Sequence, residues 1–187
     1  LMLDSYSTSD DGLTWTFTLR DNLTFSNGTE ITTDHVLASW TRWAESSAGG
    51  RFVADQLKEG GLNAQDKRTW TLETTVPFGG VAEAIGWTYK TWFIYNEGMS
   101  SVPHNMDAGE GQLDNLIGSG PYKLGEWDVG NKISMVRNEL YVPRTEKGSF
   151  LAGGRTAYVD KVTWLEIPSE ETKIAGLKTG EWDLDGQ

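Results

Sequence analysis

The stretch DGLTWTFTLRDNLTFSNGTEITTDHVLASW, residues 11–40, sets out a strand, a turn and the start of a helix in direct succession. From Leu13 to Leu19 every second residue is apolar, and the residues between them are threonines. This period of two is typical of a strand with one buried face. Asn27-Gly28 follows as a favourable turn pair, so the chain is expected to reverse before the helix begins.

A capped amphipathic helix is predicted next. Thr32 or Thr33 is suited to accept the unpaired amides of its first turn, and Asp34 places a negative charge at the positive end of the helix dipole. The helix is expected to run to about Glu45. Its apolar residues recur at three- and four-residue spacing and form one stripe that packs on the sheet: Val36, Leu37, Trp40 and Trp43.

Shorter elements follow up to the middle of the chain. Gly49-Gly50 is predicted to break the chain, with a short helix over residues 51–58 after it and a second alternating strand at residues 70–74. Residues 78–85 favour another short helix. The aromatic stretch GWTYKTWFIY, residues 86–95, is interpreted as a strand with its approach loop.

A hairpin is predicted after the middle of the chain. PYKLGEW (121–127) and KISMVRN (132–138) flank turn residues and carry strand-like patterns. The side chains expected to face inward are Tyr122, Leu124, Ile133 and Met135.

The end of the chain predicts a strand, a helix and another strand. VDKVTWLEI (159–167) favours a strand, Pro168 and Ser169 begin a helix that Gly180 ends, and EWDL (181–184) favours a second strand. Two strands joined in this way run parallel with a right-handed crossover. We therefore predict a mixed α/β fold with a mixed sheet, flanking helices and a hairpin.

Charge and composition exclude several classes of function. The chain has 187 residues, and 16 Lys and Arg stand against 27 Asp and Glu, a net charge of −11 that repels a phosphate backbone. Nucleic acid is therefore not an expected partner. The absence of cysteine and the presence of two distant histidines argue against thiol chemistry and a histidine-rich metal site. No glycine-rich phosphate loop occurs, so no cofactor is predicted.

Three blocks in fixed order resemble the family 5 extracellular solute-binding proteins, which serve ABC importers of peptides, opines and nickel. They are the stretch quoted above, IGSGPYKLGEWDVGNKISMVRNELYV at 117–142 and YVDKVTWLEIPSEETKIAGLKTGEWDL at 158–184. Each pattern alone is common, but the ordered set covers most of the chain and is specific. His35 departs from the acidic residue usual at this helix start, and we interpret it as a surface position.

The resemblance implies a two-lobed protein that closes around a small solute and delivers it to ABC permease subunits in the membrane, without enzymatic activity. Residues 1–187 would then form part of the first lobe. A peripheral subdomain is expected at about 20–116, and the hairpin and strand–helix–strand unit at 117–187 would lead to the hinge. The second lobe is expected to lie outside this chain. We expect a peptide-like solute, a monomer, and a periplasmic or extracellular location, with a lipid anchor left open.

Candidate ligand-binding residues are those that no core pattern assigns. Five tryptophans are excluded because they occupy strand or helix positions that face a core: Trp15, Trp40, Trp43, Trp70 and Trp164. Trp87, Tyr89 and Trp92 are left, in a passage that approaches the cleft in the family, and Phe52 holds a similar rim position. Ser119 in the GSGP loop offers a hydroxyl or an amide. A mostly apolar cleft with a few polar groups is typical of small-molecule sites.

A carbohydrate-active protein is the alternative. Many carboxylates together with exposed tryptophans suit a glycoside hydrolase, although Glu126, Asp128 and Glu166 show no pattern that singles out a catalytic pair. A carbohydrate-binding module would share the tryptophans. It predicts an all-β sandwich, however, which the capped helices argue against.

Overall fold

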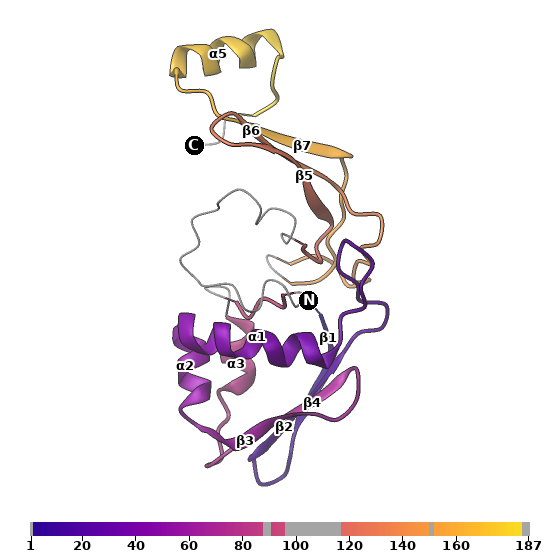
Figure 1. Cartoon of the computed structure of the whole chain (residues 1–187), viewed down its shortest axis with the longest axis vertical. Coiled ribbons are helices and arrows are strands. Elements are labelled where there is room, and N and C mark those ends of the chain that lie inside the picture. The colour runs from indigo at the N-terminus through magenta and orange to yellow at the C-terminus, as the bar shows by residue number, and fades with distance from the viewer. Residues whose placement is uncertain (1, 88–90, 96–116, 150–151, 185–187) are drawn as a thin grey trace.

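The computed structural model describes residues 2–87, 91–95, 117–149 and 152–184. Two antiparallel sheets lie in opposite halves of an elongated molecule (Figure 1). In spatial order the sheets are β1 (Leu3–Thr8), β2 (Thr14–Leu19), β4 (Thr69–Thr74) and β3 (Leu57–Ala64), and then β5 (Tyr122–Asp128), β6 (Lys132–Arg137) and β7 (Lys161–Leu165). The helices are α1 (Thr33–Ser46), α2 (Ala48–Ala54) and α3 (Val81–Gly86) beside the first sheet and α5 (Glu170–Thr179) beyond the second. No helix within the described ranges is long and apolar enough to cross a membrane. The mixed class of helices and sheets is confirmed.

The main core joins the first sheet to helices α1, α2 and α3. Alternate residues of β2 and β4 are buried, as their period of two predicts. Phe17 lies opposite Trp70 across these strands, with ring centroids 5.2 Å apart. Each large apolar side chain removed from water in this way contributes roughly 1.5–3 kcal/mol. Helices and loops complete the core with Phe25, Ile31, Val36, Trp43, Val53 and Val81.

The cap of α1 uses a residue that we expected on the surface. The Thr32 amide donates to Nδ1 of His35 at 3.2 Å. His35 is buried, and its ring meets Phe25 edge-on with centroids 5.1 Å apart. The surface interpretation of His35 is therefore wrong. Its imidazole nitrogen takes the place of the carboxylate or amide oxygen that usually completes a capping box.

Gly49 and Gly50 do not break the chain but lie buried inside α2, which replaces the helix predicted over residues 51–58. A Cβ at Gly50 would lie 2.7 Å from the carbonyl carbon of Trp43 and 2.8 Å from Cα of Ala44. Glycine is thus required because the main chains of α1 and α2 touch at this point. The chain then enters β3, a strand that the sequence pattern did not predict.

The predicted hairpin is confirmed as β5 and β6, and β7 pairs with β6 on its other side. Leu124 lies opposite Met135, Trp127 opposite Ile133, and Trp164 opposite Ile133 on the next strand. These side chains share one apolar face of the second sheet. Trp164 is 55% exposed, contrary to its expected core position. Nothing in the described part of the chain packs on this face closely enough to bury that ring.

The predicted parallel strand pair is not found in the described residues. Gly180, at φ 73°, ends α5 as expected. Trp182 then turns back onto this helix, where its Nε1 donates to the Lys173 carbonyl at 2.9 Å and its ring covers Gly176. Because Trp182 packs on α5 instead of extending beside β7, the sheets described here are antiparallel throughout.

Candidate functional site

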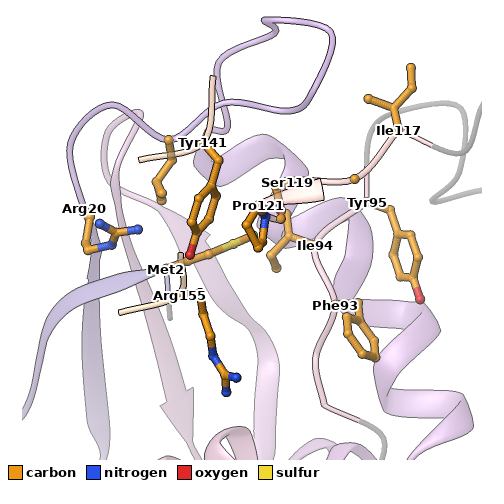
Figure 2. A pocket seen from close by; sticks show the side chains of 13 residues that line it. Met2, Arg20, Phe93, Ile94, Tyr95, Ile117, Ser119, Pro121, Tyr141 and Arg155 are labelled. Atoms are coloured by element: carbon orange, nitrogen blue, oxygen red, sulfur yellow. The ribbon is translucent and has the colours of Figure 1, made fainter. Parts of the chain in front are cut away.

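A pocket of about 470 Å³ opens where the N-terminal half of the chain meets the loop before β5 and the connection after β6 (Figure 2). Its volume lies within the ~300–1,000 Å³ typical of small-molecule sites. It is lined by Met2, Arg20, Leu23, Phe93, Ile94, Tyr95, Ile117, Gly118, Ser119, Gly120, Pro121, Tyr141 and Arg155. The fold thus brings distant segments together around Ser119, which the sequence analysis had selected.

Hydrogen bonds hold the loop of Ser119 as one wall of the pocket. The Ser26 amide donates to the Gly118 carbonyl at 2.8 Å, and Nδ2 of the buried Asn138 donates to the Gly120 carbonyl at 2.8 Å. The Asn138 amide also donates to the Pro121 carbonyl at 2.9 Å. This loop is therefore fixed before any ligand arrives, and fixed groups lose less entropy on binding.

Phe93 and Tyr95 form the aromatic end of the pocket (Figure 2). Tyr95 is tied to α1, because its amide donates to Oγ of Ser39 at 2.9 Å and the Arg42 guanidinium lies 4.9 Å from its ring centroid. Phe93 is 61% exposed, so its ring is available to an apolar ligand group. The sequence analysis selected the segment that contains these residues, but it named Trp92 and not Phe93 or Tyr95 as a ligand contact. An irregular segment has no periodic pattern that would show which side chains face a cavity.

Two arginines form the opposite end. Figure 2 shows Arg20 and Arg155 away from Phe93 and Tyr95, on the side of the pocket nearer Tyr141. Both side chains are cationic, and neither Asp nor Glu is among the described lining residues. The arginines were not predicted, since nothing in the local sequence links positions 20 and 155.

An ion pair stands close to this cationic end. Arg144 donates to both carboxylate oxygens of Glu146, at 3.0 and 2.7 Å. The Arg144 hydrogen bonds, with a smaller contribution from the charge of Arg20, hold the pKa of Glu146 down at about 2. Glu146 is therefore charged at neutral pH and already bound in a bidentate pair. Within the described ranges, no cluster of three His, Asp or Glu side chains is arranged to hold a metal ion.

Trp92 lies in the core and not at the pocket. It is 7% exposed and stacks on Trp43 at 5.2 Å with an angle of 8° between the rings. Trp40 and Trp70 meet it edge-on at 5.3 and 6.4 Å. These rings fill the space between α1 and the first sheet, so the structure gives Trp92 a packing role instead of the predicted ligand-facing one. Tyr89 lies outside the described residues.

Phe52 on α2 and Trp87 at the end of α3 are exposed aromatic residues away from the pocket. Phe52 is 55% exposed and contacts Phe78 edge-on at 5.0 Å. Trp87 is 51% exposed, and its ring lies against α2 near Gly49. Neither residue lines the pocket. Both stay predicted ligand contacts.

The fold is similar to that of known substrate-binding proteins, and the pocket has the volume of a small-molecule site. The chain belongs to the bacterial extracellular solute-binding proteins, family 5: residues 1–186 match the profile described as "Bacterial extracellular solute-binding proteins, family 5 Middle". The family resemblance drawn from the three sequence blocks is confirmed.

Relatives and solved structures agree with this assignment. The chain is 34% identical over 188 residues to the probable peptide ABC transporter periplasmic-binding protein y4tO of Sinorhizobium fredii, covering 98% of this chain and 34% of that protein. It is 25% identical over 200 residues to the dipeptide-binding protein DppE of Bacillus subtilis, covering 97% and 34%. The fold is similar to the ABC transporter substrate-binding protein CtaP of Listeria monocytogenes, with a TM-score of 0.66, 24% identity and coverage of 96% and 34%. The chain spans about a third of the length of the curated relatives that it matches.

Proposed function

We propose that this chain is part of the substrate-binding component of an ABC importer that captures a peptide-like solute. The observation that carries the proposal is the match of nearly the whole chain to family 5, together with 34% identity to a probable peptide-binding member. The pocket supports it, because it combines an aromatic end, polar groups and a fixed loop in a volume suited to a small molecule.

The proposal extends to how the whole protein works. The chain is part of the first of two lobes, with a peripheral subdomain at about 20–116 and residues 117–187 leading to the hinge. A second lobe closes over the bound solute, so the solute shifts the equilibrium toward the closed form by its higher affinity for that form. No bond of the solute is made or broken.

The same proposal sets partners and location. The closed protein is a monomer that docks on ABC permease subunits, in the periplasm or outside the cell, with or without a lipid anchor. Its net charge of −11 does not favour nucleic acid.

The carbohydrate alternative has no observation in its favour. Helices α1, α2 and α3 contribute to the core, unlike an all-β module. Of the carboxylates considered for catalysis, Glu126 pairs with Lys132 at 3.0 Å and Asp128 accepts from Asn131 at 2.8 Å. These side chains belong to the local pairing of the hairpin.

Native mass spectrometry tests the proposal. The whole polypeptide encoded by the gene is purified from its own host, and any molecule that stays bound is weighed and sequenced. We expect a peptide mass, and we expect the synthetic peptide to bind in calorimetry and to compact the protein in solution scattering. A bound glycan, turnover of an oligosaccharide, or no binding of any peptide would refute the proposed function.

A further inference from the structure

We infer that the Ser119 loop donates hydrogen bonds to a main-chain carbonyl of the bound solute, and that Phe93 receives an apolar side chain of the same solute. This inference rests on the proposed function. It deepens that function by naming the two parts of a peptide that the pocket recognises, its main chain and one large apolar side chain.

The hydrogen bonds that hold the Ser119 loop use its acceptors and none of its donors. The carbonyls of residues 118, 120 and 121 accept from Ser26 or Asn138. Within the described chain, no group accepts from the Ser119 amide, the Ser119 hydroxyl or the Gly120 amide. These three donors are therefore left for a ligand, and the carbonyl oxygen is the group of a peptide main chain that accepts from them.

The peptide plane between Gly118 and Ser119 sets the direction of one donor. In a trans peptide the N–H and the C=O point in opposite directions, and this peptide bond is trans. Its carbonyl is bound by the Ser26 amide at 2.8 Å, so the Ser119 N–H points away from Ser26. Gly118 and Ser119 line the pocket and Ser26 does not, which indicates that this donor faces the pocket.

Phe93 offers an apolar surface that the described chain leaves uncovered. Its ring is 61% exposed and lies 6.4 Å from the ring of Tyr95, at an angle of 58°. The hydrogen bond from the Tyr95 amide to Ser39 fixes this segment on α1. Tilted aromatic rings about 4.5–7 Å apart attract one another beyond the effect of buried area, so an aromatic side chain of the solute beside Phe93 would gain from both.

The donors and the exposed ring belong to one pocket (Figure 2). Leu23, Ile94 and Ile117 also line it, and an apolar lining strengthens a hydrogen bond because its effective dielectric constant is lower than that of water. Every residue of a peptide joins a carbonyl to a side chain, so a peptide can meet both features at once. A sugar supplies hydroxyl groups but no apolar side chain for Phe93.

The first test varies the solute. The whole polypeptide encoded by the gene is mixed with peptides of three or five residues, all alanine except for a central Gly, Ala, Leu or Phe, and binding is measured by calorimetry. We expect central Phe to bind at least tenfold more tightly than central Gly, because its ring is removed from water. Each amide of the tightest Phe peptide is then replaced in turn by a thioamide, whose sulfur is a weaker acceptor than oxygen. One of these replacements is expected to weaken binding about fivefold.

Variants checked for an unchanged far-ultraviolet spectrum then assign the contacts. Phe93→Ala is expected to reduce the preference for Phe over Gly below about threefold. Tyr158→Ala removes a ring that is 87% exposed and outside the pocket, and is expected to keep the preference. Ser119→Ala is expected to weaken the Phe peptide about two- to tenfold and to make the sensitive thioamide less costly, because the hydroxyl and the oxygen form one contact. Ser7→Ala, on exposed β1, is expected to change neither value.

The outcomes separate this inference from the proposed function. Equal binding of the four central residues, or a preference for Phe that survives Phe93→Ala, would overturn the apolar contact while peptide binding stands. Tolerance of every thioamide, or full affinity of Ser119→Ala, would overturn the main-chain contact in the same way. Failure of the unaltered protein to bind any peptide of the set would overturn the proposed function, and this inference with it.

Discussion

Replacing Gly50 by Ala tests the close approach of α1 and α2. The new Cβ would lie 2.7 and 2.8 Å from main-chain atoms of Trp43 and Ala44, so no side-chain rotation can relieve the overlap. Overpacking of this kind costs about 1–3 kcal/mol, and the contact with backbone places it near the upper end. The higher helix propensity of Ala offsets about 1 kcal/mol. We therefore expect Gly50→Ala to lower the free energy of unfolding by about 2 kcal/mol.

Urea unfolding and thermal melts of the purified chain measure this loss, which corresponds to a drop of about 4–8 °C in Tm at about 2–4 °C per kcal/mol. Gly86→Ala is the matched control. Gly86 ends α3, and no heavy atom of the described residues lies within 4 Å of its added Cβ. It is expected to change stability by no more than ~1 kcal/mol, in the stabilising direction. Equal stability of the two variants would refute the reasoning from close helix contact.

Three further predictions concern the cap, an ion pair and the C-terminal helix. His35→Ala removes the acceptor for the Thr32 amide and is expected to cost ~1–2 kcal/mol in urea unfolding, whereas His35→Gln keeps an acceptor and is expected to cost less; equal losses would contradict the capping role. Because Arg144 lowers the pKa of Glu146 from 4.5 to about 2, the pair stabilises the folded state above pH 4.5, and this contribution is lost as the pH falls toward 2. Carbon-13 NMR of Glu146 should give a midpoint near 2 that rises toward 4.5 in Arg144→Gln, and an unchanged midpoint would argue against the pairing. Gly176→Ala is expected to displace the Trp182 ring, so the Nε1 proton of Trp182 should exchange faster with solvent; unaltered exchange would show that the ring does not need this glycine.

The parts of the fold that sequence predicted are those with a strong local signal. β2 and β4 alternate apolar and polar residues. α1 has a capping residue and an apolar stripe, and α5 has a capping residue and a terminating glycine. β3 was missed because LKEGGLNA is charged and contains two glycines. It is a strand because it pairs with β4 across a register shift between Leu57 and Leu62, and such pairing leaves no local pattern.

The sequence led to the candidate pocket only where one short motif was sufficient. Ser119 was selected because the glycines and proline around it indicate a fixed, open loop, and it lines the pocket. Arg20 and Arg155 are far apart in sequence, and only the folded chain places them on one pocket. Trp92 and Phe93 are neighbours that point to a core and to a pocket respectively, a distinction that the irregular segment 91–95 does not encode.

The bonds that hold the Ser119 loop all end on main-chain carbonyls, those of Gly118, Gly120 and Pro121. Every amino acid supplies such an acceptor, so the wall keeps its shape whichever side chain it displays. The side chain at position 119 can therefore be exchanged without removing any of these hydrogen bonds. Under the proposed function, exchanging it for a larger or charged residue would change which solutes the pocket accepts while the loop keeps its conformation.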